Sequence, residues 1–210
     1  ITTIFLIVVG LSIKEIKKVI NAIVSFTLAI LIVNGQDFVL NNVLSPKQKQ
    51  RVETLVNPNS DPLGSGWNIT QSKIAIGSGG FFGKGFLKGT QTGLNFVPIQ
   101  STDFIFSVIG EEFGYLGSMI FVILYLIFLY RILVLSEYQK DKFARVFGYS
   151  TFSIFLFHFT INVSMTLGLF PVIGIPLSFI SYGGSSLLSF SLLLFVFLKL
   201  DSVKPSILAR

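Results

Sequence analysis

Residues 113–130 read FGYLGSMIFVILYLIFLY, eighteen residues in a row without a charged side chain. A helix needs about 20 mainly apolar residues to cross the hydrocarbon core of a bilayer. We therefore predict a membrane-spanning helix here, entered through Thr102–Glu112 and closed by Arg131.

Other uncharged apolar runs lie on both sides of this one. They predict further spans at Val19–Val43, Val146–Phe170 and Leu177–Leu198, and Ile1–Leu11 is interpreted as the end of a truncated helix. The predicted fold class is an all-α integral membrane protein, a multi-pass helical bundle with about four full spans plus a truncated one. Because the chain starts without Met inside an apolar run, we expect the N-terminal part of a longer protein to precede it.

The composition supports the same class. Hydrophobic residues make up 51% of the chain and charged residues 12%, whereas about 25% is usual for a soluble domain. The formal net charge of +6 indicates that basic loops lie near anionic lipid headgroups or that the substrate is anionic. We predict no nucleic-acid partner. The absence of cysteine excludes disulfides and thiolate metal sites.

Charge also predicts the topology. The short basic segments Ser12–Val19 and Ser136–Arg145 and the basic tail Lys199–Arg210 are expected on the cytoplasmic side. Residues 45–105 then form a large extracytoplasmic loop, and a short outer turn lies at Pro171–Pro176. In the long loop we predict turns over residues 45–66, a short amphipathic helix at Gln71–Ile76, and little regular structure among the glycines that follow.

Asp103 is the first candidate for chemistry. It lies at the predicted outer membrane boundary and is followed directly by Phe104, Ile105 and Phe106. A carboxylate at a partly dry interface suits a general base. The alternative is a helix cap, in which Ser101, Thr102 or Asp103 accepts hydrogen bonds from free amides at the start of the next helix.

Other polar residues also have two interpretations. Glu111 and Glu112 either face a groove in the protein or stabilise the helix start. The four cations Arg51, Lys73, Lys84 and Lys88 either hold a phosphate or pyrophosphate together with glycine amides, or belong to a solvated basic loop. His158 is expected to pack with one internal hydrogen bond, a proton relay being the alternative, and Asn162 and Ser164 are expected to link helices.

Three blocks of sequence carry a resemblance. The first runs from Asn57-Pro58 through DPLG (61–64) to QSKIAIGSGG (71–80) and GKG (83–85). The second contains GTQ (89–91), Pro98, TDFIF (102–106) and GEEFG (110–114), and the third runs from Pro171 through GIPL (174–177) to FISYGGSS (179–186). In this order and spacing they resemble the SEDS family (shape, elongation, division and sporulation), and Lys73, GKG and GTQ resemble its rod-shape branch, RodA, more than its division branch, FtsW.

The resemblance implies that residues 1–210 are the C-terminal part of one SEDS membrane domain. It implies polymerisation of lipid II, a disaccharide-pentapeptide on polyprenyl pyrophosphate, at the outer face of the bacterial plasma membrane. The expected reaction is an inverting glycosyl transfer in which an acceptor 4-hydroxyl attacks the anomeric carbon and polyprenyl pyrophosphate leaves. The expected protein partner is a class B penicillin-binding protein.

The resemblance also implies roles for residues. Asp103 aligns with the family's catalytic aspartate, the loop cations hold the leaving pyrophosphate, and an apolar groove among the Phe-rich helices admits the lipid tail. Whether a divalent cation, Mg²⁺ or Mn²⁺, is held in part by Asp103 and Glu112 is left open. The sequence contains no metal-ligand spacing. The predicted site residues are catalytic Asp103 and the substrate-binding residues Arg51, Lys73, Lys84, Gln91, Glu112 and Ser185.

The chain departs from the family pattern beside the aspartate. Relatives commonly read Leu-Pro-Glu-x-His-Thr-Asp, whereas residues 97–103 read VPIQSTD here, so Ile99 and Ser101 replace the usual Glu and His. Two other functions remain as alternatives: a lipid II transporter or flippase, for which His158, Asn162 or the Gly183-Gly184 break would matter most, and a non-catalytic membrane scaffold of the cell-wall machinery.

Overall fold

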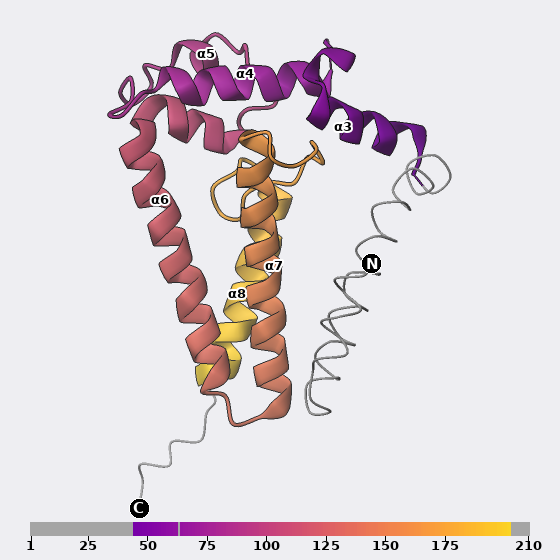
Figure 1. Ribbon diagram of the computed structural model, residues 1–210. Helices are drawn as coiled ribbons and strands as arrows, with labels where there is room; N and C mark the ends of the chain where they lie inside the picture. Colours follow the sequence, from indigo (N-terminus) through magenta and orange to yellow (C-terminus); the bar gives the residue numbers. More distant parts are fainter. Residues whose placement is uncertain (1–43, 63, 203–210) are drawn as a thin grey trace, which may run out of the picture. The chain divides into compact units, whose positions relative to one another are not determined.

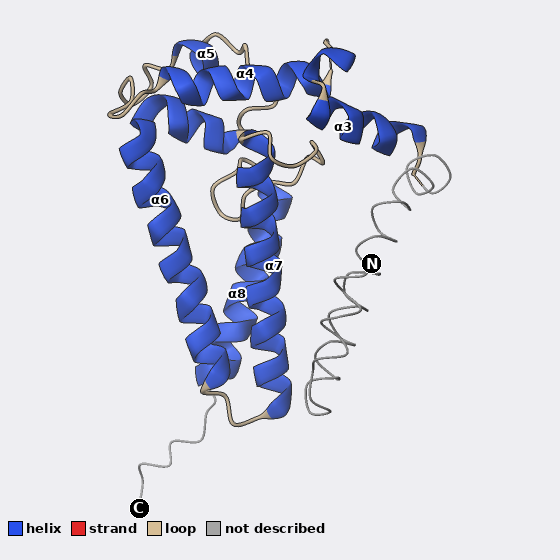
Figure 2. Ribbon diagram, in the orientation of Figure 1, coloured by secondary structure: helices blue, strands red, loops and turns tan. Residues whose placement is uncertain are grey.

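The computed structural model describes residues 44–62 and 64–202, and over these residues it contains helices, turns and loops but no strand (Figure 2). The chain divides into two compact units, residues 1–50 and 51–210. In chain order the elements are α3 (Pro46–Val56), the 3₁₀ helix η1 (Pro58–Ser60), α4 (Ser65–Ser78), α5 (Thr90–Gly93), α6 (Ile105–Glu137), α7 (Lys142–Thr166) and α8 (Gly184–Ser202).

The helices α6, α7 and α8 are each long and apolar enough to cross a membrane, with mean hydropathies of 2.5, 1.3 and 1.6 in their most apolar windows. They confirm the all-α, multi-pass membrane class. The predicted spans at Phe113–Tyr130 and Val146–Phe170 correspond to α6 and α7. The predicted elements at Val19–Val43 and Ile1–Leu11 lie outside the described residues.

The third predicted span begins in the wrong place. Leu177–Gly183 is not helical, and α8 starts only at Gly184. The Ser181 hydroxyl accepts a hydrogen bond from the Leu177 amide (2.8 Å), and Phe179 has a left-handed φ of 66°. This segment is therefore a folded turn with an apolar sequence, which hydropathy alone does not distinguish from the first turns of a span.

The predicted turn-rich start of the long loop is wrong for Pro46–Val56, which form α3, and is confirmed at the short 3₁₀ turn η1 that follows. Pro46 stands at the first helical position, where its missing N–H costs nothing. Ser45 and Gln48 form a reciprocal cap: the Ser45 amide donates to Gln48 Oε1 (3.0 Å) and the Gln48 amide donates to Ser45 Oγ (3.4 Å). The predicted helix at Gln71–Ile76 is confirmed but is longer, since α4 covers Ser65–Ser78.

The main core lies where α7 packs against both α6 and α8 (Figure 1). Phe155 of α7 is fully buried and contacts Phe190 of α8 and Phe128 of α6. Tyr125 of α6 stacks on Phe159 of α7 with ring centroids 4.4 Å apart. These aromatic contacts hold α6, α7 and α8 against one another.

The helix α4 lies across the ends of α6 and α7 and contacts both (Figure 1). A small second core between them contains Ala75, Val97, Phe104 and Met165. The Ser72 hydroxyl donates to the carbonyl of Thr166 at the end of α7 (2.8 Å). The long loop is thus a folded layer packed on the membrane helices.

The helix α6 is interrupted at Gly114, whose backbone is not helical (φ 66°, ψ −163°), and its first part turns away from the remainder (Figure 1). The break leaves backbone groups of α6 without partners inside the helix, and residues 80–85 supply partners for them. The bonds are Tyr115 N to Gly80 O (2.9 Å), Leu116 N to Phe81 O (3.1 Å), Lys84 N to Glu111 O (3.1 Å) and Gly85 N to Glu112 O (2.9 Å). Unpaired backbone groups are costly away from water, so this loop stabilises the break.

Candidate functional site

Asp103 lies in a tight turn immediately before α6. The Ile99 carbonyl accepts hydrogen bonds from the amides of Thr102 (3.2 Å) and Asp103 (3.1 Å). The N-cap of α6 is Phe104, and no side chain caps the helix there. The capping interpretation is therefore wrong, and the Asp103 carboxylate makes no hydrogen bond or ion pair with residues 44–62 or 64–202.

The connection between α7 and α8 holds this turn through its backbone. Ser181 Oγ donates to Thr102 O (2.5 Å), and the Tyr182 amide donates to Ser101 O (2.8 Å). The structure thus joins the TDFIF and FISYGGSS blocks, and it gives Ser181 a role that the sequence did not indicate. In the sequence, the only sign of this role is a serine within an apolar segment.

Asn162 of α7 ties the same turn from the other side. Its Nδ2 donates to the carbonyls of Asp103 and Ile175, both at 2.8 Å. The side chain is fully buried, so these bonds replace lost hydration. The prediction that Asn162 links helices is corrected in its detail: it joins the Asp103 turn to the α7–α8 connection.

Three predicted residues approach this connection at separate points. Arg51 Nη1 donates to Ile173 O (3.4 Å). The Asp103 carboxylate lies against Gly174, where an added Cβ would be 2.9 Å from Oδ2. Lys73 lies against Gly168, where a Cβ would be 2.6 Å from Nζ. The α7–α8 connection therefore runs past one carboxylate and two cations from separate parts of the long loop.

Lys84 is placed differently. Its ammonium donates to Glu111 Oε1 and to Thr90 Oγ1, both at 2.6 Å. Glu111 is fully buried and also accepts from the amides of Thr90, Gln91 and Thr92, each at 2.8 Å. We call this arrangement the Glu111 clamp; it fixes the glycine-rich loop to the start of α6.

The remaining predicted binding residues are not brought to Asp103 by any contact among the described residues. Gln91 belongs to the Glu111 clamp through its amide, and Ser185 is exposed in the first turn of α8. Glu112 is buried and its carbonyl accepts from the Gly85 amide. Within residues 44–62 and 64–202 no three His, Asp or Glu side chains gather as metal ligands.

His158 behaves as its packing interpretation predicted. Its Nδ1 lies 3.0 Å from Pro176 O, and its ring meets Phe190 edge-on with centroids 4.8 Å apart. The histidine thereby helps to hold the α7–α8 connection against α7.

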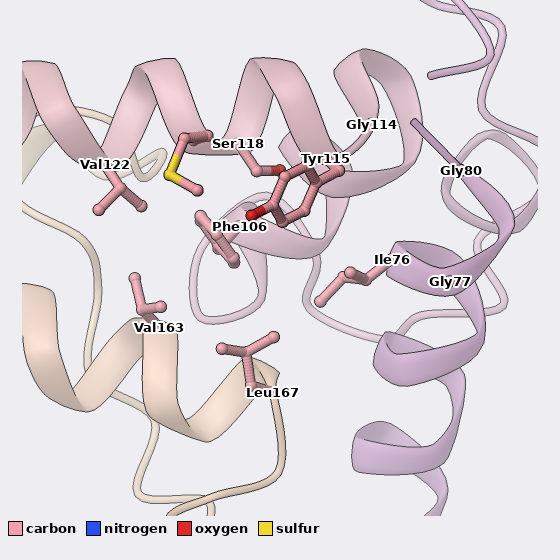
Figure 3. A pocket seen from close by; sticks show the side chains of 11 residues that line it. Ile76, Gly77, Gly80, Phe106, Gly114, Tyr115, Ser118, Val122, Val163 and Leu167 are labelled. Carbon is pink, nitrogen blue, oxygen red and sulfur yellow. The ribbon is translucent and has the colours of Figure 1, made fainter. Parts of the chain in front are cut away.

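An apolar cavity of about 430 Å³ lies between α4, α6 and α7. Phe106, Tyr115 and Val163 point into it from two of these helices (Figure 3). Asp103 does not line it, so the cavity and the aspartate turn are separate features. The lining residues are Ile76, Gly77, Gly80, Phe106, Gly114, Tyr115, Ser118, Met119, Val122, Val163 and Leu167.

Comparison with known proteins identifies the fold. The family model FtsW/RodA/SpoVE, described as cell cycle protein, matches residues 1–204. The chain belongs to the SEDS family. As a SEDS member with helices of spanning length, it is a membrane protein.

Individual SEDS relatives support the branch. The chain is 49% identical over 145 residues to peptidoglycan glycosyltransferase RodA of Treponema pallidum (strain Nichols), covering 69% of this chain and 34% of that protein. It is 47% identical over 141 residues to peptidoglycan glycosyltransferase MrdB of Escherichia coli (strain K12), covering 67% and 38%. Identity to the probable peptidoglycan glycosyltransferase FtsW of Trichlorobacter lovleyi is 41% over 146 residues, covering 70% and 38%. The resemblance to the rod-shape branch is confirmed, and the chain spans little more than a third of the length of these relatives.

A solved structure agrees with this SEDS assignment. The chain matches, with a TM-score of 0.65 and 29% identity, a chain of "Structural coordination of polymerization and crosslinking by a peptidoglycan synthase complex". The match covers 86% of this chain and 48% of the other.

Proposed function

We propose that the complete protein is a peptidoglycan glycosyltransferase that polymerises lipid II, with Asp103 as its catalytic residue. One observation carries the proposal: the Asp103 carboxylate, unpaired within the described residues, lies on the connection that Arg51 and Lys73 also contact. The named activity of the RodA and MrdB relatives supports it.

In the proposed reaction Asp103 accepts the proton of the acceptor 4-hydroxyl. The hydroxyl oxygen forms a bond to the anomeric carbon of the donor sugar from the face opposite the leaving group. The bond from that carbon to the pyrophosphate oxygen breaks, the configuration inverts, and polyprenyl pyrophosphate departs with the bonding electrons. The carboxylate is suited to this because its backbone is fixed by Asn162 while its oxygens are unpaired within the described chain.

Arg51 and Lys73 are the proposed partners of the leaving pyrophosphate. Both approach the α7–α8 connection, and both are exposed, so their charges can meet an anionic substrate. We assign Lys84 to holding the loop, because its ammonium is already bound by Glu111. Gln91, Glu112 and Ser185 are proposed as further substrate contacts from the family resemblance alone.

The proposal includes a location and a partner. The Asp103 turn and α4 face the extracytoplasmic side of a bacterial plasma membrane, and the C-terminus is cytoplasmic. A class B penicillin-binding protein is the proposed transpeptidase partner, since the similar solved structure is of a synthase complex that joins polymerization to crosslinking.

The test is polymerisation of purified lipid II by full-length Asp103→Asn. Removing a general base costs about 10²- to 10⁴-fold in rate, so we expect glycan strands to be lost while the protein stays folded in the membrane. Glu53→Gln, an exposed carboxylate on α3, is the matched control and retains activity.

Near-normal glycan strands from Asp103→Asn would overturn the proposal. In that case, labelled lipid II crossing proteoliposomes without being joined would favour a transporter. Normal cell growth with Asp103→Asn but not with a deletion would favour a scaffold.

A further inference from the structure

Four large apolar side chains point outward within seven residues that join α4 to α5. Phe82 and Leu87 are 80% and 78% exposed, and Phe81 and Phe86 are 55% and 69% exposed. Apolar side chains gathered in this way indicate a binding surface, whereas single exposed ones are ordinary. Neither the aspartate turn nor the Glu111 clamp uses these four side chains.

The backbone that carries them is held in place. The Gly83 amide donates to Gly79 O (2.9 Å), and the next two amides donate to carbonyls in the first part of α6. Gly83 and Gly85 have φ angles of 80° and 102°, which only glycine adopts readily. The outward direction of the rings is therefore fixed by backbone bonds.

Two of the rings extend the outer face of α6. Phe81 stacks on Tyr115 with centroids 5.9 Å apart, and Phe86 packs on Phe113 at 6.3 Å. Phe113 and Tyr115 are themselves exposed at the point where the uncharged run of α6 begins. Further along α6 the exposed side chains are again apolar: Leu116, Met119, Ile120, Ile123 and Leu124.

This continuity points to what covers the loop. By length and hydropathy α6 is a membrane-crossing helix, and outward apolar side chains on such a helix suit contact with lipid. The ring pairs join the loop to that face without a polar gap. Lys88 follows directly, exposed and without an ion pair to any residue in the described part of the chain. Aromatic rings with a neighbouring lysine are typical of the boundary between acyl chains and headgroups.

We propose that residues 81–87 are a membrane-interface loop that inserts Phe82, Phe86 and Leu87 into the phospholipid leaflet adjoining the start of α6. Interfacial segments bury their apolar side chains about 5–10 Å into the headgroup and acyl boundary. The loop is bonded to α6 on one side and to the Glu111 clamp on the other. It therefore fastens α4 and the glycine-rich loop to the bilayer surface, whether or not the protein transfers sugars.

The test uses one tryptophan as a depth reporter in the full-length protein. Trp67, the only tryptophan in residues 1–210, is changed to Phe, any others upstream are likewise replaced, and Phe82→Trp is introduced. The protein is reconstituted in phosphatidylcholine–phosphatidylglycerol vesicles containing lipids brominated at shallow or deep acyl positions. Asn59→Trp, at an exposed polar residue of η1, is the matched control, and Leu87→Trp is a second reporter.

We expect Phe82→Trp to emit at shorter wavelength than Asn59→Trp, to be quenched by shallow bromines, and to resist aqueous acrylamide. Full acrylamide quenching of Phe82→Trp and Leu87→Trp, with no effect of brominated lipid, would overturn the proposal. Protection that arises only after a class B transpeptidase is added would also overturn it, because the surface would then bind a protein. Loss of activity in Asp103→Asn leaves these signals unchanged.

Discussion

Glu111 and Glu112 are neighbours of one type with different surroundings. Glu111 receives three backbone amides and the Lys84 ammonium, all within 2.8 Å. No side-chain hydrogen bond reaches the Glu112 carboxylate from the described residues. The buried charge of Glu111 is thus compensated by donors. A neutral glutamine would remove the charge that pairs with Lys84 and would put an NH2 donor where one carboxylate oxygen accepts.

We therefore expect Glu111→Gln to destabilise the protein by about 3 kcal/mol, the cost of breaking a buried charged pair. The measurement is thermal unfolding of the full-length protein in detergent. Glu112→Gln is the matched control and should shift the melting temperature much less. Equal shifts for the two variants would show that the clamp does not carry this energy.

Sequence reasoning selected Asp103, Arg51 and Lys73 because their types and order in the chain matched a known pattern, and the structure brings all three to the α7–α8 connection. It placed Lys84 with the same cations and preferred Glu112 to Glu111. A one-dimensional pattern gives the sign of a charge but not its partner, and the Lys84–Glu111 pair joins residues 27 apart in sequence. Ser181 was missed for the same reason, since its acceptor lies on Thr102.

At the scale of the elements, the break in α6 depends on a missing side chain. A Cβ at Gly114 would lie 2.8 Å from Phe81 O and 2.9 Å from Gly80 O, and its φ is positive. We expect Gly114→Ala to destabilise by about 3 kcal/mol. The check is thermal unfolding beside Gly77→Ala, where an added Cβ has nothing within 4 Å and stability should hold or rise. Similar melting temperatures for both variants would contradict this account.

Hydropathy predicted the long elements well and their ends poorly. The uncharged runs located α6 and α7, because an apolar segment that crosses a bilayer must satisfy its backbone hydrogen bonds internally and so forms a helix. The start of α8 was wrong by seven residues, since the turn at Leu177–Gly183 is as apolar as the helix that follows. The helix α3 was missed, although Pro46 and the Ser45–Gln48 cap are ordinary start signals.

At the scale of the whole molecule, the net charge of +6 and the two exposed cations on the connection that Asp103 also contacts predict that the proposed binding of an anionic substrate is salt-sensitive. Screening shortens the Debye length from about 10 Å at 0.1 M salt to about 3 Å at 1 M. Over that range we expect KM for lipid II to rise while kcat changes little, measured in a polymerisation assay. The variant Arg51→Met with Lys73→Met should show a weaker salt dependence. An unchanged dependence in the double variant would place the anion site elsewhere.

The bonds between residues 80–85 and the break in α6 also bear on biogenesis. A growing chain leaves the ribosome from its N-terminus, so these residues emerge before Glu111–Leu116. The acceptors for the exposed amides of the break are synthesised ahead of the helix that needs them. An interrupted helix can then enter the membrane after the acceptors for its amides have been synthesised. With the two segments in the reverse order along the chain, those amides would enter the membrane before their acceptors existed.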